Sequence, residues 1–155
     1  MGTPRHSVMV YRDERFLIGS VTALINASFD LYDTVVVIVT QKHGKDLCMA
    51  LTIEKRLNEK LRLVDTEDLS SQFMVGDWPN EPQFTQAMER ILAPAGVRGP
   101  ARIMNELAGV LCAEGKAGAA SRVEELWNHL VTPHRFPAEC ISLSALDEDG
   151  GPTRK

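Results

Sequence analysis

The sequence contains little cysteine and no cysteine pair. Its three cysteines, Cys48, Cys112 and Cys140, are widely spaced, and no CxxC motif is present. This pattern argues against a disulfide framework or a zinc ribbon and indicates reduced thiols in a cytoplasmic protein. His129 and His134 are spaced so that a helix would present them on different faces, so they do not form a metal-binding pair. We therefore expect no metal site.

Long apolar runs and an excess of positive charge are also absent. The longest strongly apolar run, Val35 to Val39, is too short to cross a bilayer, and the amino-terminal segment has no signal core because charge returns at Arg12. The 17 basic residues are outnumbered by 21 acidic ones, and the net charge is −4. Because nucleic-acid backbones require clustered Lys and Arg, we expect a cytoplasmic protein that binds neither nucleic acid nor membrane directly.

The sequence lacks the common catalytic motifs. It has no G-x-S-x-G nucleophile elbow. The nearest match to a phosphate-binding loop is Gly44-Lys45, but Val39 stands where the first glycine should be, and Asp46 replaces the magnesium-binding hydroxyl. A carboxylate there repels phosphate at a helix N-terminus that would otherwise attract it. We predict a protein that is not an enzyme and carries no cofactor.

The 155 residues suit one domain, for which we take residues 1–146, followed by a polar, disordered tail at 147–155. Strands are predicted at Ser7–Tyr11, Thr34–Thr40, Leu61–Val64, Ala101–Met104 and Glu139–Leu143. Helical patterns lie between them. The first contains Leu17, Val21, Leu24 and Ile25 on one face after an Asp13 cap, and the others are 46–60 after a loop at 41–45, 66–75, 82–92 and 119–130. Residues 103–111 also fit one helix face.

This alternation predicts an α/β fold with a mainly parallel sheet and helices on both faces. The continuous β-branched run from Thr34 to Thr40 is typical of a strand that is buried on both sides.

Several short segments resemble those of a known family. They are His6, Thr40-Gln-Lys-His43, Leu63-Val-Asp65, Phe73-Met-Val-Gly-Asp-Trp-Pro79, Asn105-Glu-Leu107, Leu111-Cys-Ala-Glu-Gly115 and Arg122-Val-Glu-Glu-Leu-Trp-Asn128. Together they resemble the MEDS family, the sensory domain named for methanogens, methylotrophs and the dichloromethane-responsive repressor. The resemblance runs from about residue 6 to residue 144. It implies a RecA-like or KaiC-like fold without a functional phosphate loop, and a sensory role beside histidine kinases, response regulators or transcription regulators.

The chain departs from the family pattern at Arg102-Ile-Met-Asn105 and at Leu31-Tyr-Asp33. Both segments lie where strands meet the edge of the sheet, so a ligand site there can differ from that of the relatives.

The predicted site lies at the carboxyl ends of the strands, where open parallel sheets form their ligand crevice. Tyr11, His43, Asp65 and Glu106 follow from this rule as ligand- or partner-binding residues. Trp78, in a Gly-Asp-Trp-Pro turn, is a further candidate as an exposed interface anchor, although it can equally pack over a helix.

We predict a stand-alone cytoplasmic sensory domain that recognises a small organic ligand or a signalling protein and relays its state. The partner would be a histidine kinase, a response regulator or a transcription regulator, and a homodimer is compatible with this role. Two alternatives stay open. One is a degenerate RecA-like nucleotide-binding enzyme that uses Glu106 and Asp65, and the other is a purely structural oligomerisation module.

Overall fold

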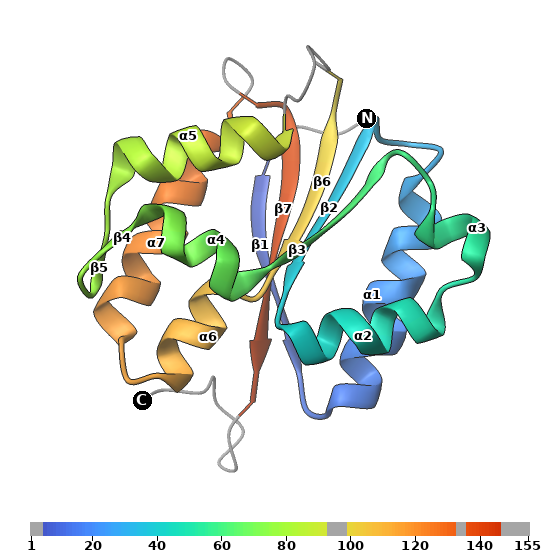
Figure 1. Ribbon diagram of the computed structural model, residues 1–155, viewed down its shortest axis with the longest axis horizontal. Coiled ribbons are helices and arrows are strands. Elements are labelled where there is room, and N and C mark those ends of the chain that lie inside the picture. Colours follow the sequence, from blue (N-terminus) through green and yellow to red (C-terminus); the bar gives the residue numbers. More distant parts are fainter. Residues whose placement is uncertain (1–4, 93–98, 133–135, 147–155) are drawn as a thin grey trace.

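The computed structural model describes residues 5–92, 99–132 and 136–146, so the predicted tail at 147–155 lies outside the described residues. A parallel sheet of five strands stands at the centre of the molecule between two layers of helices (Figure 1). Helices α1, α2 and α3 cover one face of the sheet, and α4, α5, α6 and α7 cover the other. The structure is the α/β fold that the sequence predicts, with a parallel sheet and helices on both faces.

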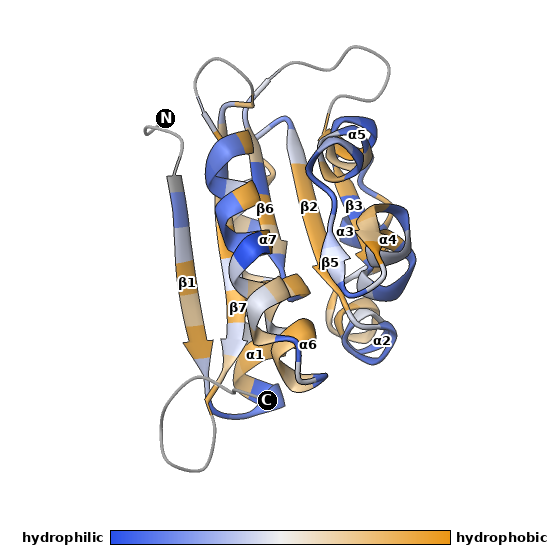
Figure 2. Ribbon diagram, turned by 90° about the vertical axis from the view of Figure 1, so that its left-hand side faces the viewer, coloured by the Kyte–Doolittle hydropathy of each residue, from blue (hydrophilic) through white to orange (hydrophobic). Residues whose placement is uncertain are grey.

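The strands of the sheet are all parallel and occur in the order β1-β7-β6-β2-β3 (Figure 2). Their bounds are β1 Arg5–Tyr11, β2 Thr34–Val39, β3 Leu61–Asp65, β6 Ala101–Asn105 and β7 Ala138–Ala145. The predicted strands are therefore confirmed. Strands β1 and β3, at the two edges, are far apart in space although both belong to the first half of the chain.

Seven helices connect the strands within the described residues. They are α1 Glu14–Ser28, α2 Gln41–Ala50, α3 Ile53–Arg56, α4 Thr66–Phe73, α5 Glu81–Leu92, α6 Leu107–Ala113 and α7 Ala117–Leu130. A small antiparallel hairpin, β4 Met74–Val75 and β5 Trp78–Pro79, follows α4. Its turn begins at Gly76, whose φ of 63° lies in the left-handed region that favours glycine.

Strand β2, between β6 and β3, contributes to both halves of the core because successive side chains point to opposite faces of the sheet. Val35, Val37 and Val39 pack against α1 and α2. Val36 and Ile38 pack into the second core, together with residues from α4, α5, α6 and α7. All six residues of β2 are buried, as the continuous β-branched run predicts.

Three predicted element boundaries are wrong. The segment 41–45 is not a loop, and Asp46 does not begin a helix to Lys60. Instead, the Thr40 side chain accepts a hydrogen bond from the His43 backbone, so α2 begins at Gln41, and a second cap at Thr52 starts the short α3. The helix predicted at 66–75 ends at Phe73, because Met74 and Val75 pair in the β4–β5 hairpin.

The alternatives for residues 101–111 are both realised in part. Strand β6 continues to Asn105, and α6 begins at Leu107.

The connections place a topological switch point between β2 and β6. The chain leaves β2 through α2 and α3 on one face, whereas it leaves β6 through α6 and α7 on the opposite face. Because β2 and β6 are neighbours in the sheet, their carboxyl ends lie side by side, and the chain segments that follow them diverge to opposite faces. Open α/β sheets form their ligand crevice at such a place.

Candidate functional site

The first residues beyond β2 and β6 meet at the switch point. The Glu106 backbone N–H donates to the Ile38 carbonyl at 2.9 Å, which extends the sheet register by one residue. This contact turns the Glu106 side chain toward the start of α2, where the Thr40 backbone N–H donates to Glu106 Oε2 at 2.9 Å. Glu106 is only 4% exposed. A buried carboxylate thus lies at the N-terminus of a helix, where the backbone favours an anion.

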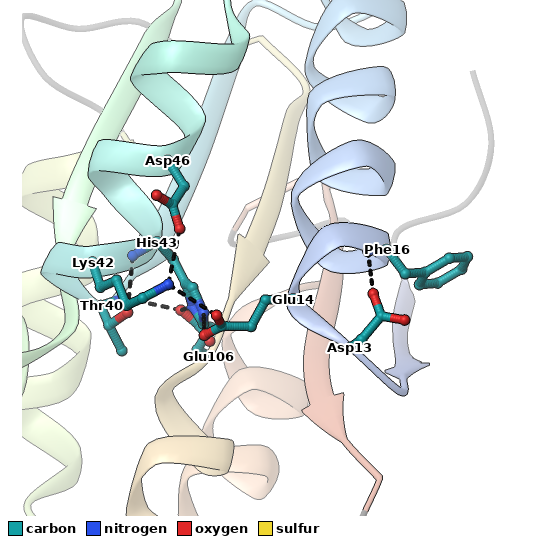
Figure 3. Close-up of polar contacts among 8 residues, drawn as sticks. All are labelled: Asp13, Glu14, Phe16, Thr40, Lys42, His43, Asp46 and Glu106. Carbon is teal, nitrogen blue, oxygen red and sulfur yellow. Dashed lines mark hydrogen bonds and ion pairs between the residues drawn. The ribbon is translucent and has the colours of Figure 1, made fainter.

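His43, in the first turn of α2, is held between two carboxylates (Figure 3). Its Nδ1 lies 2.9 Å from Glu106 Oε1 and 2.8 Å from Oε2, and its Nε2 lies 3.0 Å from Glu14 Oε1. The hydrogen bond with Glu106 raises the pKa of His43, burial opposes this, and the charges of Glu106 and Glu14 add to the increase. The geometry therefore favours an imidazolium that donates from both nitrogens.

Glu14 reaches this cluster from the first position of α1. Asp13 caps that helix by accepting a hydrogen bond from the Phe16 backbone at 2.8 Å, which confirms the predicted cap. The Lys42 ammonium bridges Glu14 at 2.9 Å and Asp46 at 3.1 Å. Hydrogen bonds from Lys42 and His43 lower the pKa of Glu14. Glu14 is exposed, so these ion pairs position side chains more than they stabilise the fold.

Tyr11 ends β1 and borders the same cluster. Burial raises the pKa of Tyr11 to about 12, and the negative charges of Glu106 and Glu14 contribute to the increase. A cavity of about 160 Å³ is lined by Tyr11, Glu106 and Ser144, among others. The Tyr11 hydroxyl and the Glu106 carboxylate provide this cavity with polar groups that can accept hydrogen bonds from a ligand.

A larger groove of about 800 Å³ lies on the other side of Thr40, between α2 and β3. Asp65 lines this groove, and its side chain caps α4 by accepting a hydrogen bond from the Asp68 backbone at 3.0 Å. The predicted site is therefore divided: Tyr11, His43 and Glu106 come together, whereas Asp65 lies across β2 in a different depression.

Trp78 does not belong to the cluster. It lies in β5, which packs beside α7 (Figure 1). The side chain is 52% exposed, and one edge of it approaches Gly118 of α7. Trp78 is thus half exposed, and it also packs partly over a helix. Its role as an interface anchor stays a prediction.

The segment that comes nearest to a phosphate loop in the sequence, Gly44-Lys45, is helical in the structure. Thr40 is the single residue between β2 and α2, so Gly44 and Lys45 lie inside the helix instead of in a loop that could wrap a phosphate. The helix N-terminus already contacts the Glu106 carboxylate.

Sequence reasoning missed Glu14 and Thr40. Both follow a predicted strand closely, and a threonine at a strand-to-helix junction is a common cap, so Thr40 carried a usable signal. For Glu14 the sequence shows only that it lies in the first turn of a predicted helix, and this position does not indicate that it contacts His43.

A second histidine, His6 of β1, contacts residues of two other elements. Its Nε2 lies 2.7 Å from both Glu124 of α7 and Ser142 of β7, and its Nδ1 lies 3.1 Å from Asn128. Burial lowers the pKa of His6, but the hydrogen bond and charge of Glu124 outweigh this and raise it overall. The contacts tie the edge strand β1 to its neighbours.

Within residues 5–92, 99–132 and 136–146, no group of three or more His, Cys, Asp or Glu side chains is arranged to hold a metal ion. His134 lies outside these residues. Cys140 is fully buried, which raises the pKa of its thiol, and it accepts a hydrogen bond from Asn105. Across the same described part of the chain, no helix has the length and apolar character needed to span a membrane.

Comparison with known proteins supports the fold alone. No family model and no curated protein matches the chain. A solved structure of a prototypical ATPase from the type III secretion system of pathogenic bacteria superposes with a TM-score of 0.64 at 11% sequence identity. The match covers 96% of this chain and 46% of that chain, so the present chain spans under half the length of that ATPase.

Proposed function

We propose that this chain is a RecA-like sensory domain that does not hydrolyse nucleotides and that recognises a small polar organic ligand at the Tyr11–His43–Glu106 cluster. One observation carries the proposal. The anion-binding position at the switch point is taken by the protein's own carboxylate, Glu106, which the Thr40 N–H and His43 bind.

This carboxylate works against nucleotide binding in two ways. It uses the backbone donor that a phosphate would need, and its negative charge repels a second anion. The same group suits a hydrogen-bond donor or a small organic cation. Such a ligand would enter the cavity lined by Tyr11 and Glu106 and would compete with His43 for the carboxylate.

The cluster is also suited to relay the bound state. His43 belongs to α2, Glu14 to α1, and Glu106 to the junction of β6 and α6. A ligand that draws Glu106 away from His43 therefore changes the contacts of three elements at once. If the ligand binds one conformation of the cluster more tightly than the other, it shifts the population toward that conformation. The size of the shift is set by the difference between the two affinities.

A thermal-shift screen of small polar metabolites tests the ligand site. A ligand at about 100 times its Kd adds about 2.7 kcal/mol to the free energy of unfolding. We expect at least one compound to raise the Tm of the wild type, and this shift to shrink in Tyr11→Phe. Tyr32→Phe is the matched control, because it also removes a partly buried hydroxyl but at the opposite end of the sheet, where Tyr32 accepts from Arg102. Shifts that are equal in both variants would place the ligand elsewhere.

The enzyme alternative has one observation in its favour, namely that the similar solved structure is an ATPase. At 11% identity this likeness concerns the fold. The two carboxylates that the alternative requires bind different partners: Glu106 contacts His43, and Asp65 caps α4. Magnesium-dependent ATP turnover that is abolished by Lys45→Ala would favour the enzyme over the sensory domain.

A further inference from the structure

The outer edge of β3 is an open end of the sheet. Within the described residues β3 pairs with β2 on one side, and no strand pairs with its other edge. Natural proteins usually protect such an edge with Lys, Pro, a bulge or a covering element. The β3 sequence, Leu-Arg-Leu-Val-Asp, contains no Lys or Pro, and its central residue Leu63 is 37% exposed. This edge is available for pairing with another chain.

An apolar groove runs beside this edge. The depression of about 800 Å³ has Leu63 and the end of β2 as its floor, and Cys48 and Met49 of α2 as its wall. Met49 is 86% exposed. Helix α3 and the residue that follows it lead the chain back toward β3 and carry two further exposed apolar side chains, Ile53 and Leu57.

Acidic residues outnumber basic ones along the groove. Asp65, Glu67 and Asp68 line its end at the start of α4, and Lys45 is the one cation among the described lining residues. Glu67 and Asp68 are exposed to solvent. An occupant with a basic side chain at this end would therefore be favoured, and an acidic one disfavoured.

We propose that this groove binds an extended segment of a partner protein, which adds to β3 as a further strand. Its alternate apolar side chains would lie over Leu63 and Met49, and a Lys or Arg would face Asp65, Glu67 and Asp68. An extended peptide supplies the backbone N–H and C=O groups that the open edge requires, which a small ligand does not.

This inference goes beyond the proposed function, because it gives the domain a partner surface separate from its ligand cluster. Helix α2 connects the two places. His43 in its first turn contacts Glu106, while Gly44, Lys45 and Cys48 line the groove. A ligand that releases His43 would thereby alter a wall of the groove.

The experiment is a display selection of random peptides of about twelve residues, long enough to cover β3, against the full chain. We expect enriched sequences with alternating apolar residues and a basic residue near one end. Fluorescence anisotropy with a synthetic peptide of the consensus sequence then measures the affinity. We expect Met49→Asp to weaken binding about tenfold or more, and Glu67→Gln with Asp68→Asn to weaken it about three- to tenfold.

The control is Val8→Asp on β1, the opposite edge of the sheet, where Val8 is also exposed. It should leave the affinity unchanged. The three substituted positions in the groove, Met49, Glu67 and Asp68, are exposed, so the variants should fold, and circular dichroism verifies this. N-methylation of alternate peptide bonds should abolish binding, since it removes the donors that would pair with β3.

The proposal is overturned if no peptide is enriched, if the consensus is acidic, if Met49→Asp binds as well as the wild type, or if Val8→Asp weakens binding as much as Met49→Asp does. None of these outcomes depends on Tyr11 or on ATP turnover. Failure of the groove and failure of the ligand site can therefore be told apart.

Discussion

The His43–Glu106 pair provides the sharpest test of how the switch point is built. His43→Ala removes the imidazolium and leaves the Glu106 carboxylate, 4% exposed, with the Thr40 N–H as its remaining hydrogen bond among those described. Removing one partner of a buried ion pair usually costs 3–5 kcal/mol. The neighbouring cavity can admit water to the carboxylate, so we expect a loss near the lower end, about 3 kcal/mol. The exposed contact with Glu14 adds little.

A second substitution should recover part of this loss. In His43→Ala/Glu106→Gln the buried charge is absent, and the remaining cost is about 1 kcal/mol for imperfect hydrogen bonding. The double variant should therefore be more stable than His43→Ala by about 2 kcal/mol. Urea unfolding at pH 6, followed by tryptophan fluorescence and circular dichroism, measures the three free energies. A double variant that is no more stable than His43→Ala would refute the reasoning.

The pH dependence gives an independent check. Because folding raises the pKa of His43, the stability from this pair is fully present below the ordinary histidine value of about 6.5 and is lost as the pH rises through the raised pKa of the folded state. His6 titrates in the same direction, since its pKa is also raised. The difference between wild type and His43→Ala isolates the contribution of His43. This difference should become smaller toward higher pH, and a constant difference would contradict an imidazolium.

Three further outcomes are expected. Trp127→Ala should cost about 3–5 kcal/mol in urea unfolding, because Trp127 is fully buried with its ring edge-to-face on Phe84 at 5.1 Å; a loss below about 1 kcal/mol would contradict the core assignment. Asp13→Ala should cost about 1 kcal/mol through the lost cap of α1, whereas Asp30→Ala, a control at an exposed carboxylate, should be near neutral. ATP with magnesium should show no turnover, and turnover that depends on Lys45 would overturn this.

Much of the architecture could be predicted from local patterns. The β-branched run at 34–39 determines a strand buried on both faces, and the apolar stripe that includes Val123, Leu126 and Trp127 determines the buried face of α7. Asp13 predicts the start of α1 because a cap acts on backbone donors within the next turn. These features depend on residues close together in the sequence, so a periodicity or a cap is sufficient to identify them.

The candidate site was only partly accessible in this way. The rule that ligands bind at the carboxyl ends of parallel strands selected Tyr11, His43 and Glu106, which the structure places together. The same rule also selected Asp65, which the fold places in the groove beside α4, and it missed Glu14. The rule identifies an edge of the sheet, but it does not order the strands along that edge.

The sequence by itself thus determined the elements, the two-sided burial of β2 and the polar character of one sheet edge. Only the tertiary structure decided that β2 lies between β6 and β3, and hence that Thr40 donates to Glu106 from 66 positions away and that Asp65 faces a separate groove. The physical reason is that strand order follows from how helices on both faces share the available apolar surface, which is a property of the whole chain. A local pattern records which side of an element is buried, but not which neighbour buries it.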